Sequence, residues 1–331
     1  MSFIKNTVQT YSNDSRLLYK ALNGIFLLYK SPSVAFGRMK GTVISNLCRD
    51  LNNMNVRPPT KYVSIEGATN TDMNVIIRDS YADNILVVGP RYQMNDFKLG
   101  STILSSTDLS GLVVCGINAG NKLVRKLRNA NMTRCYKVKG LLGQATDNYF
   151  HTGKIVEKST YAHVKRGHID NICSSMQSSH QRKMFELSGV DIQSQAAYDL
   201  AVQGLLRPAD SNIPMVYTIK CTDFSPPEFT LEIVCINEYD MYLKTIIHEV
   251  GVQLHSTATC TQIYCGREGL FTVESALLKK YWTLSNILNN IQMCRKIINE
   301  NPYLIDQDSP TLVDGSSTDS PKVLIEGEST T

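Results

Sequence analysis

The chain is organised around residues 134–147, which read RCYKVKGLLGQATD. We expect a β-strand over residues 134–142, where Tyr136 and Val138 alternate with lysines. A polar loop with turn-forming residues is expected to follow over residues 146–153. The stretch therefore predicts a strand that carries Tyr136 in its body and ends in a loop.

A basic segment precedes this strand and runs into it. Between residues 121 and 140 there are seven basic residues and no acid, namely Lys122, Arg125, Lys126, Arg128, Arg134, Lys137 and Lys139. On the helix expected there, Arg125 and Arg128 share a face and Lys122 lies one turn earlier. Such a patch would neutralise several phosphates and bind nucleic acid in a salt-dependent way. An ordinary basic surface helix is the alternative.

Outward from this region, strands and helices follow one another irregularly. Apolar runs and alternating patterns predict strands at 24–30, 61–65, 74–78, 110–117, 215–221, 230–236 and 257–264. Spacings of three and four residues predict helices at 34–51, 169–176, 195–205, 241–254, 273–281 and 284–298. The mixture lacks the strict strand–helix alternation of a doubly wound sheet and therefore favours an α+β fold.

Composition and charge exclude several classes of protein. The 331 residues carry a net charge of +4, but residues 301–331 hold six acids against one lysine, which leaves +9 on the first 300. A positive folded part favours polyanionic partners. No run of 18 apolar residues is present, so we expect no membrane-spanning helix.

The motif search removes the commonest catalytic sites. Gly-x-Gly-x-x-Gly, the Walker-type loop and Gly-x-Ser-x-Gly are all absent, so nucleotide-binding and serine-hydrolase sites have no support. The nine cysteines include no Cys-x-x-Cys pair, which argues against a zinc site and for a reducing compartment. The motif search therefore supports neither a metal site nor a nucleotide or serine-hydrolase site.

Four blocks of sequence resemble a known family. Residues 134–147, with 153–157, resemble the tyrosine-centred motif of TruB-type pseudouridine synthases. Further blocks agree with this family in order, at residues 29–32, 242–251 and 269–277, so the similarity extends over about residues 23–282. Two other stretches, 177–181 and 224–229, resemble the animal mitochondrial branch of the family.

The resemblance implies an architecture and a location. It implies a pseudouridine synthase fold, which is α+β with a large, mainly antiparallel sheet, flanking helices and a central RNA-binding cleft. We expect this domain over residues 23–301. Residues 1–22 fit either a mitochondrial presequence or a surface helix, and residues 302–331 are expected to form a disordered acidic tail. The branch implies the mitochondrial matrix.

The resemblance also implies an activity. Enzymes of this family break the N1–C1′ bond of uridine, turn the base in place and rejoin it through C5, without metal or cofactor. The uridine must leave its RNA stack, at a cost on the order of a few kcal/mol. The implied partner is tRNA or mitochondrial mRNA, with proteins of mitochondrial RNA granules as further partners. No membrane span is implied.

The motifs assign roles to individual residues. By resemblance, Tyr136 is the platform on which the extruded base stacks, and it is a candidate for helping to remove the C5 proton. Lys244 takes the place of an arginine that pairs with the catalytic aspartate, and it loses the bidentate fork. Ile263 would form an apolar wall of the pocket. The cations expected to contact RNA are Lys122, Arg125, Lys126, Arg128 and Lys137.

The sequence departs from the family at the nucleophile. When the segment is anchored on Ser110 and Gly111, the position of the family aspartate is Ser106. A serine hydroxyl is neutral and is a weak nucleophile without a positioned base. Asp108 lies two residues further on and is a candidate substitute, although an extended segment would place it about 7 Å along the chain.

Three hypotheses follow from this departure. The chain is an active or weakly active pseudouridine synthase that uses Asp108, or it is a catalytically inactive RNA-binding pseudoenzyme that acts as an RNA chaperone or assembly factor. In the third hypothesis it is an assembly protein that makes its contacts through the acidic tail and residues 52–100, and RNA binding is incidental.

Overall fold

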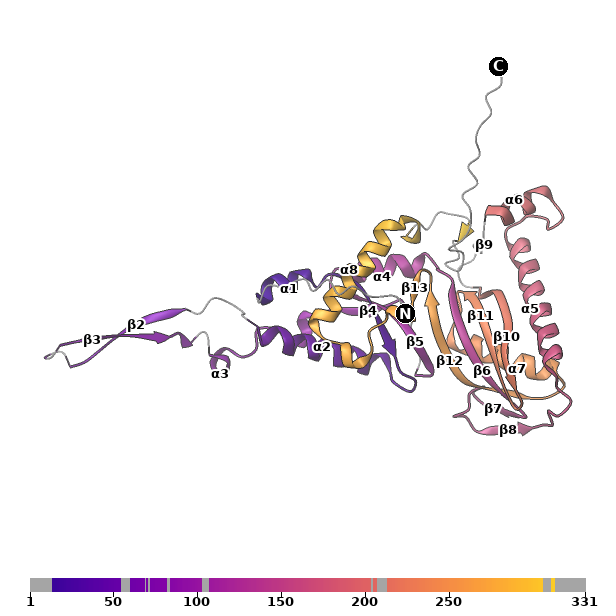
Figure 1. Ribbon diagram of the computed structural model, residues 1–331, viewed down its shortest axis with the longest axis horizontal. Coiled ribbons are helices and arrows are strands. Elements are labelled where there is room, and N and C mark those ends of the chain that lie inside the picture. The colour runs from indigo at the N-terminus through magenta and orange to yellow at the C-terminus, as the bar shows by residue number, and fades with distance from the viewer. Residues whose placement is uncertain are drawn as a thin grey trace, which may run out of the picture. The chain divides into compact units, whose positions relative to one another are not determined.

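The computed structural model describes residues 14–54, 60–68, 70, 72–81, 84–102, 107–203, 205–206, 213–305 and 311–312. Two compact units make up the chain, and their elements are labelled in Figure 1. Unit 1 comprises residues 1–128 and 273–302, and unit 2 comprises residues 129–272 and 303–331. The expectations for residues 1–13, for Ser106 and for most of the segment 302–331 lie outside the described residues.

The strands at the centre of unit 1 are antiparallel. β1 (Gly24–Lys30) pairs with β5 (Leu109–Ile117), with Lys30 opposite Gly111. β4 (Leu99–Ser101) pairs with the end of β5. Every residue of β5 is buried, as its continuous apolar run predicts for an interior strand.

Helices pack with the strands to form the hydrophobic core of unit 1. They are α1 (Ser15–Ala21), α2 (Phe36–Asn52), α3 (Ile85–Val88), α4 (Gly120–Asn129) and α8 (Leu284–Glu300). α2 buries Met39, Val43 and Leu47, which are spaced four apart and form a single stripe. This stripe belongs to one hydrophobic cluster with Phe26 of β1 and Ile287 of α8.

A hairpin in unit 1 leaves its apolar side chains exposed. β2 (Lys61–Glu66) and β3 (Asn74–Asp79) pair only with each other among the described strands. Directly opposed pairs share a face, and one face carries exposed aliphatic side chains, namely Val63 opposite Ile77 and Ile65 opposite Val75. The hairpin therefore adds little to the core of the unit.

Unit 2 is built on a second antiparallel arrangement of strands. The order is β12 (Ala258–Glu268), β6 (Arg134–Leu142), β11 (Glu228–Ile236) and β10 (Met215–Ser225), and β13 (Phe271–Thr272) pairs with the end of β12. β6 lies between β12 and β11, so its residues have neighbours on both sides.

Two helices pack on these strands of unit 2. α5 (Arg166–Leu187) lies against β10, and α7 (Asp240–Gln253) lies against β12 and β6 (Figure 1). The remaining elements are α6 (Gln195–Gln203), the pair β7 (Gln144–Thr146) and β8 (Ile155–Lys158), and the pair β9 (Leu205–Leu206) and β14 (Thr311–Leu312). α7 therefore lies beside β6, the strand that carries Tyr136.

The expected fold class is confirmed. The structure is α+β, its strand pairings are antiparallel in each unit, and helices flank the strands. The strand predicted at 134–142 has the same bounds as β6. The helix predicted at 273–281 is wrong, because two short 3₁₀ turns, Val273–Ser275 and Lys279–Tyr281, occupy that segment. No helix in the described part of the chain is long and apolar enough to cross a bilayer.

Candidate active site

Tyr136 lies in β6, with a side chain that is 1% exposed. Ile233 of β11 and Cys265 of β12 are directly opposite it, so the three side chains share one face of the strands. Because side chains alternate along a strand, the neighbouring Lys137 points to the other face, where it is exposed. The strand therefore separates Tyr136 from the cation that follows it in the sequence.

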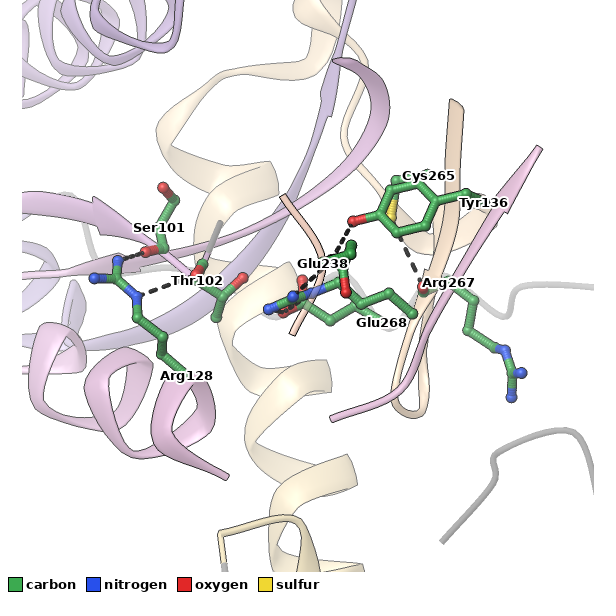
Figure 2. Close-up of polar contacts among 9 residues, drawn as sticks. Ser101, Thr102, Arg128, Tyr136, Glu238, Cys265, Arg267 and Glu268 are labelled. Atoms are coloured by element: carbon green, nitrogen blue, oxygen red, sulfur yellow. Dashed lines mark hydrogen bonds and ion pairs between the residues drawn. The ribbon is translucent and has the colours of Figure 1, made fainter. Parts of the chain in front are cut away.

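A carboxylate engages the hydroxyl of Tyr136. The hydroxyl donates a hydrogen bond to Glu238, as Figure 2 shows. The distance between Tyr136 Oη and Glu238 Oε1 is 2.7 Å. Glu238 lies in the turn between β11 and α7, where Asn237 adopts a left-handed conformation with φ of 57°. This turn ends the strand and brings Glu238 onto the tyrosine.

Arg134, two residues before Tyr136, forms ion pairs with two carboxylates. Its Nη1 is 2.8 Å from Glu238 Oε1, and its Nη2 is 3.2 Å from Glu268 Oε1. Arg134 Nε also donates to Glu268 Oε1 at 3.2 Å. The side chains of Arg134, Glu238 and Glu268 are 11%, 2% and 1% exposed. We call Arg134, Tyr136, Glu238 and Glu268 the carboxylate cluster.

The surroundings of the cluster fix the charge states of two of its members. Burial raises the pKa of the Tyr136 hydroxyl well above its usual range, and the charge of Glu238 raises it further. Burial lowers the pKa of Arg134, but Glu238 and Glu268 outweigh burial and hold this pKa well above its ordinary value. At neutral pH the phenol is therefore neutral and the guanidinium is charged.

One oxygen of the cluster lacks a hydrogen-bond donor. Among the described residues, no group donates to the buried Oε2 of Glu238. Leaving a buried acceptor without a partner costs about 1–3 kcal/mol, and more for a charged group. Such a group in a native structure calls for an explanation, and a catalytic role is one of them. Glu238 is therefore the residue of the cluster that calls for a functional explanation.

Two other residues singled out from the sequence lie in the same unit. Ile263 of β12 is buried opposite Val138, on the sheet face that also carries Tyr136. Lys244 lies on α7, with a side chain that is 6% exposed and an Nζ 2.8 Å from Asp240 Oδ2. The same Nζ lies 5.0 Å from the centre of the Phe150 ring. Lys244 is thus a buried cation that is held within its own helix.

The segment around Asp108 belongs to unit 1. Asp108 is half-buried, and its Oδ1 accepts a hydrogen bond from Thr107 Oγ1 at 3.1 Å. The fully buried ammonium of Lys30 donates to the main-chain oxygens of Thr107, at 3.2 Å, and of Leu109. Lys30 therefore fixes the backbone on both sides of Asp108. Ser106 lies outside the described residues.

The basic helix is confirmed as α4, and it is amphipathic. It buries Val124 and Leu127, whereas Lys122, Arg125 and Lys126 are exposed. These three cations share the solvent side of the helix because their spacing keeps them away from the buried stripe. They offer a positively charged surface of the kind expected to contact phosphates.

Arg128, the last of the basic residues predicted on this helix, is used by the protein itself. Its Nε donates to the main-chain oxygen of Thr102 at 3.1 Å, and its Nη2 donates to that of Ser101 (Figure 2). Arg128 thus ties the end of α4 to the chain that leaves β4. Its guanidinium is therefore less available to a ligand than the charged groups of Lys122, Arg125 and Lys126.

The cysteines do not assemble into a metal site. All nine are free thiols, and no group of three or more His, Cys, Asp or Glu within the described ranges is placed to hold a metal ion. Burial raises the pKa of Cys235 and of Cys265 well above the usual range. These residues are therefore neutral core thiols at neutral pH.

Sequence reasoning misses the two glutamates of the carboxylate cluster. Glu238 follows a strand and Glu268 ends one, and neither position carries a motif that marks its partner. Lys30 lies within one of the family blocks, but the block does not predict its contacts. A signal is present, because a lysine at the end of the apolar run Gly24–Lys30 must find acceptors if the strand is buried.

Comparisons of the amino-acid sequence with known proteins identify relatives of this chain. A sequence profile described as TruB family pseudouridylate synthase (N terminal domain) matches residues 107–241. The chain is 39% identical over 285 residues to the protein named "Pseudouridylate synthase TRUB2, mitochondrial" from Xenopus tropicalis, covering 84% of this chain and 87% of that protein. It is 36% identical to the human protein of the same name, covering 82% of this chain and 83% of the human one.

A solved structure shows a looser similarity. The archaeal protein in "Crystal structure of the archaeal box H/ACA sRNP Nop10-Cbf5 complex" superposes with a TM-score of 0.42 and 10% sequence identity. The superposition covers 89% of this chain and 61% of that one. At this level the comparison supports no conclusion about mechanism.

Proposed function

The chain belongs to the TruB family of pseudouridylate synthases, and on that premise we propose that it converts uridine to pseudouridine in RNA. The observation that carries the proposal is the extent of the similarity, which covers 84% of the chain at 39% identity to a relative named as such a synthase. The chemistry needs no external reactant, because the base is detached from C1′ and rejoined through C5 of the same uridine.

The names of the relatives also support a location. The proteins from Xenopus tropicalis and Homo sapiens are both named mitochondrial, and we therefore place this chain in mitochondria. We further propose tRNA or mitochondrial mRNA as its substrate and RNA-granule proteins as further partners. The exposed cations of α4, at Lys122, Arg125 and Lys126, are the residues proposed to hold the phosphates.

Within this proposal, the buried residues of unit 2 contact the base. Tyr136 provides the aromatic platform, and Ile263 provides an apolar surface on the same sheet face. Since the ring of Tyr136 is buried, a base reaches it only when the side chains that cover it move aside. Lys244 supplies a positive charge near the reacting sugar, and Asp108 supplies the negative charge that Ser106 lacks.

A second function is favoured by the serine at position 106, which we assign to the position of the family aspartate. Loss of an essential catalytic group commonly lowers the rate by several orders of magnitude. A chain that kept the RNA-binding surface but not the nucleophile would bind RNA without modifying it. In that case the protein acts as an RNA chaperone or assembly factor.

A comparison of three proteins separates these functions. Wild type, Asp108→Asn and Ser106→Asp are incubated with uridine-containing RNA, and pseudouridine is quantified after digestion to nucleosides. We expect conversion by wild type, a loss of about 100-fold or more in Asp108→Asn, and faster conversion by Ser106→Asp.

Each other outcome has a definite meaning. Equal, non-zero conversion by wild type and Asp108→Asn would remove Asp108 from the mechanism but keep the activity. No conversion by wild type, together with conversion by Ser106→Asp, would establish a pseudoenzyme that retains a functional scaffold. No conversion by either protein, with RNA binding intact, would contradict the proposed activity.

A further inference from the structure

The carboxylate cluster places two carboxyl groups around one guanidinium in a buried position. Arg134 carries one positive charge, and Glu238 and Glu268 are two carboxylates against it. Placing carboxylates in a low-dielectric interior is costly unless each is paired and hydrogen-bonded. The two carboxyl groups share the single guanidinium of Arg134, and one of them also contacts the hydroxyl of Tyr136.

The contacts divide unequally between the two carboxylates. Glu268 accepts from Nε and Nη2 of Arg134 through a single oxygen. Glu238 Oε1 receives hydrogen bonds from both Arg134 and Tyr136, at 2.8 Å and 2.7 Å. The second oxygen of Glu238 receives none from the described residues. Glu238 is thus the carboxylate that is coupled to the tyrosine and has unused proton-accepting capacity.

We propose that Glu238 is a positioning residue that accepts the hydroxyl proton of Tyr136 while Tyr136 removes the C5 proton of the rearranged base. The proposal rests on the proposed synthase function and deepens it. When the C5–H bond breaks, its proton moves to Tyr136 Oη and its electron pair forms the C5=C6 double bond. The π pair of the N1=C6 double bond moves at the same time to N1, which takes up a proton from water. The original hydroxyl proton moves to Glu238 Oε1, which becomes a neutral carboxylic acid and later releases the proton to water.

The state of the phenol explains why the tyrosine needs such an acceptor. Burial and the charge of Glu238 hold the pKa of Tyr136 well above its usual range, so a free phenolate is not available at neutral pH. A neutral phenol oxygen can take a proton only if it gives one up in the same step. Glu238 is the acceptor that the structure places within hydrogen-bond distance of that hydroxyl.

Arg134 and Glu268 hold the carboxylate of Glu238 in the position where it contacts Tyr136. Because Glu268 engages Nε and Nη2 of Arg134, Nη1 is left directed at Glu238. This arrangement fixes the carboxylate of Glu238 at the start of α7 and against β6. A purely structural role, in which the ion pairs only pin α7 to the strand, predicts that the two glutamates matter equally.

A matched pair of variants separates the two roles. Glu238→Gln and Glu268→Gln each remove one carboxylate charge, keep the side-chain shape and leave Arg134 paired with the other glutamate. We therefore expect similar changes in the free energy of unfolding. Conversion of uridine should fall about 100-fold or more in Glu238→Gln, as for loss of a general base, and by far less in Glu268→Gln.

The division of the loss between kcat and KM gives a readout that a structural role would not move. In Glu238→Gln the loss should fall on kcat, with a KM for RNA close to that of wild type, because the proton acceptor is missing while the RNA-binding surface is kept. Glu268→Gln should change both constants little.

Further variants keep the proposal falsifiable if Glu238→Gln fails to fold. Glu238→Asp retains a carboxylate and should recover part of the activity, and Tyr136→Phe should lose as much activity as Glu238→Gln. Equal losses in Glu238→Gln and Glu268→Gln, or a loss in Glu238→Gln that falls on KM rather than on kcat, would overturn the proposal alone. A wild type without any conversion would overturn the proposed function, and this proposal with it.

Discussion

Lys30 ends β1 as a buried ammonium group that donates to main-chain carbonyls on both sides of Asp108. Hydrogen bonds from a charged donor are among the stronger ones in proteins, and a buried acceptor without its donor keeps its full desolvation cost. The lysine thus fixes the local backbone that presents Asp108. Lys30 acts by fixing the position of the main chain around Asp108 rather than by contacting a ligand.

Replacing Lys30 with methionine tests this role. Lys30→Met keeps the aliphatic stem and removes two charge-assisted hydrogen bonds, each worth about 1.5 kcal/mol. We expect the free energy of unfolding in urea to fall by about 3 kcal/mol. Lys20→Met, at an exposed position of α1, is the control and should stay within about 0.5 kcal/mol of wild type. A Lys30→Met variant as stable as this control would contradict the assignment.

Cys294 of α8 makes the free energy of unfolding depend on pH in the alkaline range. Burial raises the pKa of its thiol from 9.0 to about 12. Between these values the unfolded chain loses the proton while the folded chain keeps it, so this contribution is full below pH 9 and is lost as the pH rises towards 12. The free energy of unfolding should fall faster with pH in wild type than in Cys294→Ala, by up to about 1.4 kcal/mol per pH unit.

Denaturant titrations between about pH 8 and 10.5 measure this difference. The methyl-sized void left by Cys294→Ala gives a constant offset, which does not change with pH. Only the slope of the free energy of unfolding against pH therefore reports the titration of the Cys294 thiol. Parallel lines for the two proteins would show that the thiol titrates alike in the folded and unfolded chains.

Sequence reasoning at the residue scale succeeds where a motif names the position and fails where a contact links distant segments. The pattern around Tyr136 locates this residue, and its strand has the expected bounds. Glu238 lies 102 positions away in the sequence and reaches the tyrosine through a turn after another strand. No local sequence pattern predicts the contact between Glu238 and Tyr136, because this contact depends on the order of the strands in the sheet.

At the scale of elements, α4 combines a buried stripe with an exposed basic surface. Val124 and Leu127 fix the helix to its unit, while Lys122, Arg125 and Lys126 remain in solvent. The sequence places Arg128 in the same RNA-binding set, but its guanidinium binds the carbonyls of Ser101 and Thr102. A test of RNA binding should therefore spare Arg128, whose removal would disturb the protein itself.

The triple variant Lys122→Gln/Arg125→Gln/Lys126→Gln tests the basic surface. Removal of each phosphate contact should lower the slope of log affinity against log salt by about 0.7 for single-stranded RNA, or about 2 in total. Affinity at low salt should fall accordingly. Filter binding or fluorescence anisotropy over a series of salt concentrations measures both quantities.

A control variant tests whether position or charge alone matters. Replacement of three exposed lysines elsewhere in unit 1, at positions 279, 280 and 296, by glutamine removes the same charge. We expect a smaller change in slope for this control. Equal losses of affinity in the two triple variants would show that α4 has no special role and that net charge alone attracts RNA.

The error at residues 273–281 has a physical cause at the scale of elements. The apolar spacing there resembles a helix, but the main chain of Leu277 is hydrogen-bonded to β1 in both directions, through Leu27 and Tyr29. A residue whose amide and carbonyl serve a strand cannot also serve a helix. The indole of Trp282 donates to the same carbonyl of Leu277 and reinforces the turn.

At the scale of the whole molecule, the family blocks are spread over both compact units. The block at residues 29–32 begins in β1 of unit 1, and the tyrosine motif and the block at 242–251 lie in unit 2. The sequence could predict the α+β class because each strand and helix carries its own periodicity. It could not predict the carboxylate cluster, which arises only when β6, β12 and the turn before α7 come together.

The charge of the molecule agrees with an RNA substrate but does not decide what happens to it. The first 300 residues carry +9, which favours a polyanion whether or not chemistry follows. The acidic segment 301–331 would weaken rather than strengthen that attraction. Binding and catalysis must therefore be measured separately on the full chain.

Release of tritium from RNA labelled at C5 of uridine tests the central claim most directly. Formation of pseudouridine replaces the C5 hydrogen by the bond to C1′, so each turnover frees one labelled proton to water. We predict tritium release by the wild-type chain, in proportion to pseudouridine formed, and its loss in Tyr136→Phe with RNA still bound. RNA that binds to the wild-type chain but retains all of its tritium would contradict the account.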